Sequence, residues 1–147
     1  MKIHEVKDTK RTYLDLLLLG DEDEKMIERY LDRGRLFVLD DGDVRAVCVV
    51  TDEGNGTLEI KNLAVKKDYR GRGYGRAMIE FVKALAIEGF SLIKVGTGDS
   101  PLTVPFYEKC GFTRSYVVKN FFSDNYDHPI YEGGILLTDM VYLSIEV

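Results

Sequence analysis

A run of glycine and arginine at residues 70–76, Arg-Gly-Arg-Gly-Tyr-Gly-Arg, constrains the fold of this chain more than any other feature. The segment before it, residues 57–65, follows a glycine-rich turn and reads as a β-strand. The segment after it, residues 73–88, repeats apolar side chains every three or four positions, as an amphipathic α-helix does. A short apolar strand is expected next, at 92–95. This order predicts two parallel strands joined by a right-handed crossover.

The remaining segments add antiparallel strands and further helices to this unit. Asp41-Gly42 and Gly54-Asn55-Gly56 are typical of hairpin turns, so the strands that flank each turn should pair antiparallel. Hairpins combined with one crossover predict the α/β class with a mixed sheet. Strands are expected at 2–6, 35–39, 44–51, 57–65, 92–95, 113–122 and 138–145, helices at 11–19, 23–32 and 73–88, a short helix that opens at Ser100 or Thr103 and ends at Gly111, and a loop at 124–134.

The strand at 57–65 departs from simple alternation. Leu58 and Ile60 share one parity, whereas Leu63 and Val65 share the other. One extra residue near Lys61 would bring all four side chains to the same face, which is what a β-bulge does. Burial of both faces in a central strand would explain the same pattern without a bulge.

Composition is that of a small acidic domain. The 147 residues suit a single domain spanning 1–147. A formal net charge of −5 argues against general nucleic-acid binding. No apolar stretch approaches the roughly 18–20 residues that span a bilayer, so no membrane partner is expected. Cys48 and Cys110 lie far apart without a metal-binding pattern, which predicts buried thiols of a cytoplasmic protein and no metal site.

The glycine-arginine turn has the chemistry of an anion site. The first turn of a helix leaves backbone N–H groups without partners, and the helix dipole favours negative charge there. Glycines adopt backbone conformations that are closed to other residues. Arg70, Arg72 and Arg76 can add charge-assisted hydrogen bonds. A diphosphate is therefore the expected ligand, although a solvated basic turn would contain the same residues.

Two nucleotide-binding patterns do not fit this turn. A dinucleotide-binding turn requires G-x-G-x-x-G, whereas the glycines here fall at 71, 73 and 75. A P-loop requires Gly-Lys-Ser/Thr after four intervening residues, a string that the chain lacks. A nucleotide-binding module is weakened by pattern alone, and tight binding of ATP would restore it.

Three motifs together resemble the GNAT N-acetyltransferase superfamily. Arg70-x-x-Gly73-x-Gly75 resembles the acetyl-CoA pyrophosphate loop of that family, and residues 59–65 resemble its central strand. Residues 106–112, Phe-Tyr-Glu-Lys-Cys-Gly-Phe, resemble its last helix and turn. The motifs occur in the family's order, and the resemblance covers about residues 35–122.

The resemblance implies an acetyl-CoA-dependent enzyme with a twisted, mostly antiparallel sheet, a central splayed parallel strand pair and helices on both faces. The pantetheine arm would lie between the splayed strands and bond the backbone of the first. A bulge would free an N–H near Leu63 to polarise the thioester carbonyl. The residues implied to bind acetyl-CoA are Leu63, Ala64, Val65, Arg70, Gly71, Arg72, Gly73, Tyr74, Gly75, Arg76, Thr97, Ser100 and Tyr107.

Two residues have catalytic roles by this resemblance. Tyr107 stands where many members place the acid that protonates the leaving thiolate, or it could only pack in the core. Glu59 stands where some members place the base, acting directly or through water, or it could be an exposed polar residue of the strand. Asn62 would orient a water or the pantetheine, or it would only stabilise the bulge.

The resemblance implies less about the residues that bind the amine acceptor. Many members carry Asn seven residues before the tyrosine, where this chain has Ser100, which can bond the cofactor or only cap a helix. In the 124–134 loop, His128 could border the acceptor site, and Asp127 and Glu132 would suit a cationic amine. A lone histidine in a loop is also an ordinary surface residue.

The resemblance therefore implies transfer of the acetyl group from acetyl-CoA to a primary amine of a small molecule or a protein. A non-catalytic acyl-CoA-binding or regulatory domain is the alternative, because it would share the turn without requiring Tyr107. Aromatic residues that are expected to be exposed near Tyr116, Phe121 and Phe122 could support a homodimer.

Overall fold

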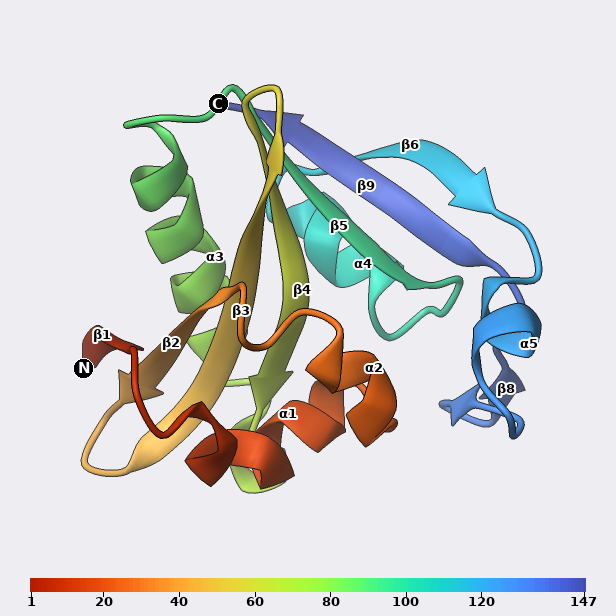
Figure 1. Ribbon diagram of the computed structural model, residues 1–147, viewed down its shortest axis with the longest axis horizontal. Helices are drawn as coiled ribbons and strands as arrows, with labels where there is room; N and C mark the ends of the chain where they lie inside the picture. The colour runs from red at the N-terminus through yellow and green to blue at the C-terminus, as the bar shows by residue number, and fades with distance from the viewer.

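A computed structural model describes all 147 residues as a seven-stranded sheet flanked by helices, with a small two-stranded hairpin beside it (Figure 1). The elements are β1 (Lys2–Val6), η1 (Lys10–Tyr13), α1 (Leu14–Gly20), α2 (Glu24–Glu28), β2 (Arg35–Asp40), β3 (Val44–Gly54), β4 (Thr57–Val65), η2 (Lys67–Tyr69), α3 (Tyr74–Ala86), β5 (Leu92–Gly98), α4 (Val104–Lys109), β6 (Thr113–Val118), α5 (Phe121–Asn125), β7 (Tyr131–Glu132), β8 (Ile135–Leu136) and β9 (Met140–Glu146). No helix is long and apolar enough to cross a membrane.

The strand order is β1-β2-β3-β4-β5-β9-β6, and only the β4–β5 pair is parallel. The mixed sheet and its single crossover agree with the sequence-based expectation. Both predicted hairpin turns are present, with positive φ at Gly42, Gly54, Asn55 and Gly56. The chain therefore builds one half of the sheet from consecutive hairpins and the other half after the glycine-arginine turn.

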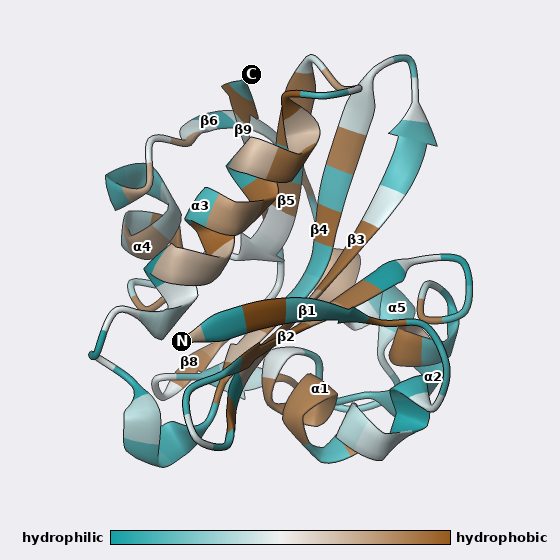
Figure 2. Ribbon diagram, turned by 90° about the vertical axis from the view of Figure 1, so that its left-hand side faces the viewer, coloured by the Kyte–Doolittle hydropathy of each residue, from teal (hydrophilic) through white to brown (hydrophobic).

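Helices cover both faces of the sheet (Figures 1 and 2). Helix α3 packs its apolar side chains on one face, where Met78, Ile79 and Val82 are fully buried. Helices α1 and α2 cover the other face, and α1 is largely hydrophobic in Figure 2. Cys48 and Cys110 are both buried free thiols, as their spacing predicted.

The predicted bulge in β4 is present. The register with β3 shifts between Val49 and Val50, and it skips Lys61. As a result Leu58 and Ile60 pack in the same core cluster as Leu63 and Val65. The extra residue also turns Asn62 toward α1, where it is buried against the helix. The bulge therefore shapes both faces of the strand that leads into the glycine-arginine turn.

The strands β4 and β5 pair over only part of their length. The ladder runs from Thr57–Leu92 to Ile60–Val95, and beyond it the strands diverge (Figure 1). Backbone groups of residues 61–65 that face β5 therefore have no strand partner there. The gap between the two strands opens toward α4 and the C-terminal segments.

The C-terminal region differs most from expectation. The strand predicted at 113–122 ends at Val118, because Asn120 adopts a left-handed φ of 57° and starts α5. The segment expected to be a loop at 124–134 contains part of α5 and strand β7 of the β7–β8 hairpin. Of the three aromatics expected to be exposed, Tyr116 is exposed, whereas Phe122 is buried in a small cluster with Ile130 and Leu137.

The predicted helices are also shorter than expected. The stretch at 23–32 gives only α2, after which turns lead to Gly34. The stretch at 11–19 begins as the 3-10 helix η1 and becomes α1 at Leu14. In α4, Thr103 occupies the N-cap position and Pro105 lies in the first turn, as the second of the two predicted openings requires.

Candidate active site

A cavity of about 790 Å³ lies at the opening between β4 and β5. It is bordered by the glycine-arginine turn, α4, the segment between α1 and α2, and the β7–β8 hairpin. Most residues expected to bind acetyl-CoA line it, although Arg72 and Ser100 do not. Those lining it are Leu63, Ala64, Val65, Arg70, Gly71, Gly73, Tyr74, Gly75, Arg76, Thr97 and Tyr107.

The turn at one end of the cavity is built for an anion. Gly71 and Gly73 have φ of 76° and 88°, a region that L-residues with a side chain rarely adopt. Gly73 is the N-cap of α3, so the unpaired N–H groups of the first helical turn lie next to the cavity. Arg70 and Arg76 line the same end. This arrangement fits a diphosphate by both charge and hydrogen bonding.

Side-chain contacts hold the turn in place. The Tyr74 hydroxyl donates a hydrogen bond of 2.7 Å to the Asp41 carboxylate in the β2–β3 hairpin. The Arg72 guanidinium lies 5.0 Å from the centre of the Tyr69 ring, and Tyr69 lines the cavity whereas Arg72 does not. Gly75 is required for a different reason, because a Cβ there would lie 3.1 Å from the Phe106 ring.

The open edge of β4 forms the floor of the cavity. Residues 61–65 lie beyond the last pair with β5, and Leu63, Ala64 and Val65 line the cavity. The Val65 carbonyl accepts a hydrogen bond of 3.3 Å from Arg70 Nε, and the remaining unpaired backbone groups fit the amides of a pantetheine arm as hydrogen-bond partners. The turn and this edge together form a continuous surface suited to acetyl-CoA, with a basic end for the phosphates and a backbone edge for the arm.

Tyr107 lies in the wall of the cavity on α4. Its side chain is buried, with 7% exposed, and its ring packs edge-on against Phe106 and Phe112. Burial raises the pKa of the Tyr107 hydroxyl, and the nearby Cys48, Cys110 and Glu132 groups act in the same direction. The hydroxyl therefore keeps its proton at neutral pH and is available as a donor.

Glu59 lies elsewhere. It is only 4% exposed, does not line the cavity, and forms ion pairs with Lys61 at 2.9 Å and Lys94 at 3.5 Å. Lys94 is its register partner on β5. Its place outside the cavity and its two lysine partners weigh against the expected base role.

Ser100 and Thr97 also differ in position, because Thr97 lines the cavity and Ser100 does not. Ser100 is 2% exposed, and its hydroxyl accepts a hydrogen bond of 3.0 Å from the Leu102 N–H, which is a local turn contact. Thr97 lines the cavity, and its hydroxyl is 2.8 Å from that of Thr103 at the start of α4. The structure therefore gives Ser100 a turn-stabilising contact and leaves Thr97 within the cavity.

The opposite end of the cavity is acidic. Asp21 and Glu22 reach it from the segment between α1 and α2, and Glu132 reaches it from β7. The Asp21 carboxylate accepts hydrogen bonds from the hydroxyls of Tyr126 at 2.8 Å and Tyr30 at 3.4 Å. Burial raises the pKa of Asp21, and it also raises the pKa of Glu132.

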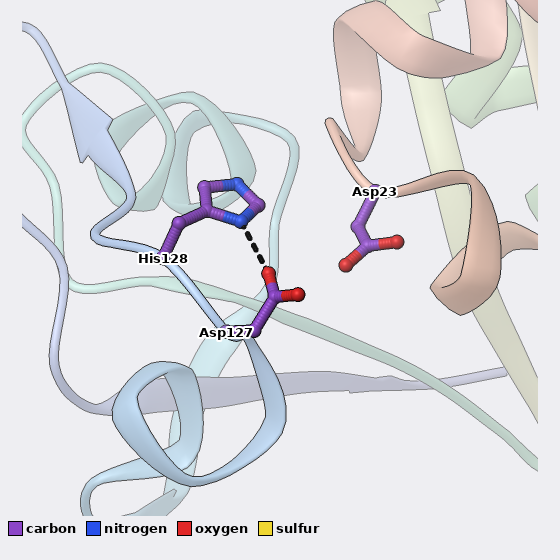
Figure 3. Close-up of side chains that lie close together, drawn as sticks. All are labelled: Asp23, Asp127 and His128. Carbon is purple, nitrogen blue, oxygen red and sulfur yellow. Dashed lines mark hydrogen bonds and ion pairs between the residues drawn. The ribbon is translucent and has the colours of Figure 1, made fainter.

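The expected acceptor loop is divided by the structure. Tyr126, Ile130, Tyr131 and Glu132 line the main cavity, whereas Asp127 and His128 do not. His128 bonds Asp127 at 2.7 Å and lies on the outside of the loop near Asp23 (Figure 3). These three residues place possible metal-ligand atoms within 4.8 Å of one another, but His128 and Asp127 are exposed.

Sequence reasoning missed Asp21 and Tyr126 as cavity residues, and it missed Tyr30 as a residue that bonds Asp21. Asp21 belongs to an acidic run at 21–24 that is indistinguishable from a solvated surface segment. One signal was available for the hairpin, because Gly133-Gly134 lies between two apolar-containing pairs and is typical of a two-residue turn.

Known proteins resemble this chain in sequence and in fold. The "Acetyltransferase (GNAT) domain" family model matches residues 32–114. The Bacillus subtilis (strain 168) protein described as "Uncharacterized N-acetyltransferase YvbK" is 33% identical over 150 residues, covering 100% of this chain and 97% of that protein.

Two solved structures match the whole fold. A GNAT family acetyltransferase from Elizabethkingia anophelis with acetyl-CoA bound has a TM-score of 0.93 and 34% identity, covering 99% of this chain and 97% of that one. A Bacillus subtilis acetyltransferase in complex with CoA has a TM-score of 0.92 and 33% identity, covering 99% and 98%.

The fold and the site thus define an acyltransferase of the acetyl-CoA-binding type. The chain belongs to the GNAT acetyltransferase family.

Proposed function

We propose that the protein transfers the acetyl group of acetyl-CoA to a primary amine by direct attack within a ternary complex. The observation that carries this proposal is one cavity that joins three groups: the anion-binding turn, the open edge of β4 and the Tyr107 side chain. An acidic compartment continues from them, with room for an acceptor. A binding domain without catalysis would require neither the buried tyrosine nor this compartment.

The chemistry demands a proton acceptor and a proton donor. An alkyl ammonium has a pKa near 10.4, so about one molecule in 10³ is neutral at pH 7, and deprotonation costs roughly 4–5 kcal/mol. The amine nitrogen forms a bond to the thioester carbonyl carbon as the carbon–sulfur bond breaks. The departing thiolate takes the proton of the Tyr107 hydroxyl, and the tyrosinate regains a proton from the water that accepts the proton of the amine. Because Glu59 is paired with two lysines, water in the cavity is the better candidate for accepting the proton of the amine.

Tyr107→Phe tests the acid role. The substitution keeps the ring packing against Phe106 and Phe112 but removes the donor. We expect kcat for release of free CoA thiol to fall about 10²-fold or more, with the acetyl-CoA dissociation constant and the melting temperature nearly unchanged. Glu108→Gln, an exposed change on the same helix, serves as the control. Unchanged turnover in the phenylalanine variant would remove Tyr107 from the mechanism.

The proposal also covers the domain organisation, the cellular location and the oligomeric state. Residues 1–147 act as one domain, because β9 at the C-terminal end lies between β5 and β6 of the same sheet. Two buried free thiols suit a reducing cytoplasmic location. A homodimer would form through the edge strand β6, whose Tyr116, Val117 and Val118 are exposed. Light scattering of the purified protein distinguishes dimer from monomer.

A further inference from the structure

The acidic end of the cavity contains three carboxylates without fixed cationic partners. Asp21 and Glu132 form no ion pair with any lysine, arginine or histidine side chain, and Glu22 has only the exposed His128 at 3.8 Å. Arg76 lies at the phosphate end and Lys61 is held by Glu59, whereas Arg70 partly offsets the rise that burial causes in the pKa of Glu132 without forming an ion pair with it. The cavity is therefore polarised, with its free negative charge on the acceptor side.

The segment that contains Asp21 and Glu22 lies next to the part of β4 where the thioester is expected, around Leu63. Gly20, the residue before Asp21, packs so closely on the bulge of β4 that a Cβ there would lie 2.2 Å from the Asn62 Oδ1 and 3.3 Å from the Leu63 carbonyl oxygen. Glu132 comes from the other side and is close enough to Tyr107 to raise its pKa. The two carboxylates thus flank the region between Leu63 and Tyr107.

Asn62 provides a second, independent sign of a ligand. Its Nδ2 donates to the Leu17 carbonyl at 2.9 Å and to the Tyr30 hydroxyl at 3.1 Å, which fixes the orientation of the amide. Its Oδ1 is buried and has no hydrogen-bond partner, and Asn62 lines the cavity. A buried acceptor without a donor is costly, so this site is suited to an N–H group.

The carboxylates are poorly suited to recognise the reacting nitrogen alone. Negative charge next to an ammonium raises its pKa, which would keep the nitrogen protonated and unable to attack. The same charge is useful if it binds a second ammonium that does not react. The arrangement therefore favours an acceptor with two cationic nitrogens, one of which loses its proton.

We propose that the acceptor is a small aliphatic diamine or polyamine, whose non-reacting ammonium is bound by Asp21 and Glu132. This inference rests on the proposed acetyl transfer and names its substrate class. Tyr30 and Tyr126 hold the Asp21 carboxylate in place from two different segments, so the acceptor half is preformed. Glu22 adds negative charge at the same end of the cavity.

Three amines of equal chain length test the proposal: 1,4-diaminobutane, n-butylamine and 4-aminobutanoate. With saturating acetyl-CoA, we expect kcat/KM for the diamine to exceed that for n-butylamine at least tenfold, and 4-aminobutanoate to be the poorest acceptor. Added salt should reduce the difference, because screening weakens the ammonium–carboxylate attraction. A preference for n-butylamine or 4-aminobutanoate would overturn the proposal while leaving the acetyltransferase function intact.

Single-residue variants test whether Asp21 and Glu132 bind the non-reacting ammonium. Asp21→Asn and Glu132→Gln should each raise KM for the diamine about tenfold, reduce its kcat/KM advantage over n-butylamine, and leave acetyl-CoA binding unchanged. Asp15→Asn removes one exposed carboxylate of α1 outside the cavity and is the matched control. If Asp21→Asn fails to fold, Glu132→Gln on the separate hairpin still tests the inference. Unchanged diamine KM in a folded Glu132→Gln variant would contradict it.

A binding measurement separates this inference from the proposed function. In the presence of CoA, which cannot donate an acetyl group, 1,4-diaminobutane should raise the melting temperature and 4-aminobutanoate should not. Diamine binding without acetylation would support the acidic site and overturn the transferase proposal. Acetylation of other amines without diamine binding would support the transferase proposal and overturn the diamine site.

Discussion

Tyr126 donates a 2.8 Å hydrogen bond to Asp21, a residue 105 positions earlier in the chain, and so joins the two segments that enclose the acidic end of the cavity. Asp21 lies between α1 and α2, whereas Tyr126 follows α5. The hydroxyl is half-buried, and the carboxylate it contacts is buried enough for its pKa to be raised. This bond therefore connects the stability of the C-terminal segment to the shape of the acceptor compartment.

Tyr126→Phe removes the hydrogen bond that connects these two segments. Loss of a hydrogen bond to a charged group is expected to lower the free energy of unfolding by about 1–3 kcal/mol. The KM for the amine should rise more than kcat falls, because Tyr126 is not in contact with the thioester region. Denaturant unfolding and initial rates measure both effects. Tyr116→Phe, an exposed tyrosine of β6, is the control and should change stability by less than about 0.5 kcal/mol.

Local patterns in the sequence were sufficient to predict the strand, the bulge, the turn and the helix that border one end of the cavity. The parity change between Ile60 and Leu63 predicted the bulge. In a strand with alternating side chains, one extra residue is needed to return the apolar side chains to the same face. Gly71 and Gly73 marked positions that require positive φ, and an apolar repeat marked the helix that follows. These signals lie within one strand–turn–helix unit, so they needed no long-range information.

The acceptor half could not be predicted in the same way. Asp21, Tyr30 and Tyr126 come together only through tertiary packing, and none stands in a distinctive local pattern. Glu59 was expected near the chemistry because of its place in the strand, but the parallel register sets it opposite Lys94. Such pairings depend on how strands align, which the sequence of one strand does not specify.

Gly73→Ala should destabilise the turn that opens α3. At a φ of 88° a Cβ costs about 1–2 kcal/mol, even though nothing lies within 4 Å of where it would be placed. The variant should also bind CoA more weakly, because the strained turn moves the N–H groups that contact the phosphates. Gly89→Ala has no positive φ and equally open space, so it should be neutral in both thermal unfolding and CoA titration.

The three arginines of the turn should differ in their effect on CoA binding. Arg70 and Arg76 line the cavity, whereas Arg72 does not line it and lies against the Tyr69 ring. Replacing Arg70 or Arg76 with alanine is expected to weaken binding about tenfold, which corresponds to about 1.4 kcal/mol for one charge-assisted bond. Arg72→Ala should weaken it less than threefold. Calorimetric titration with CoA checks the order, and an equal loss at all three positions would indicate a diffuse electrostatic effect.

The same titration tests the location of the cofactor site itself. An Arg70/Arg72 double alanine variant that folds but binds CoA as tightly as the parent would show that the diphosphate lies elsewhere. Repeating the titration at high salt adds a check, because loss of a phosphate contact should reduce the salt dependence of binding. Retained salt dependence in Arg76→Ala would likewise place that arginine outside the phosphate contacts.

His128 should make stability depend on pH near neutrality. The hydrogen bond with Asp127 raises the pKa of His128, and the carboxylates of Glu22 and Asp23 act in the same direction. Since the pKa is higher in the folded protein, the stabilising contribution is fully present below the unfolded value of about 6.5 and is lost as pH rises through the folded pKa. The same pair lowers the pKa of Asp127, so that carboxylate remains ionised across this range.

Nuclear magnetic resonance can measure the shift directly, because the chain has only two histidines. His4→Gln assigns the two imidazole signals, and the His128 signal should titrate above 6.5. Asp127→Asn removes the partner at 2.7 Å and should return the His128 pKa toward its ordinary value. The melting temperature of His128→Gln should then lack the decline that the parent shows as pH rises above about 6.5. A His128 pKa at or below 6.5 in the parent would show that this exposed pair is not formed in solution.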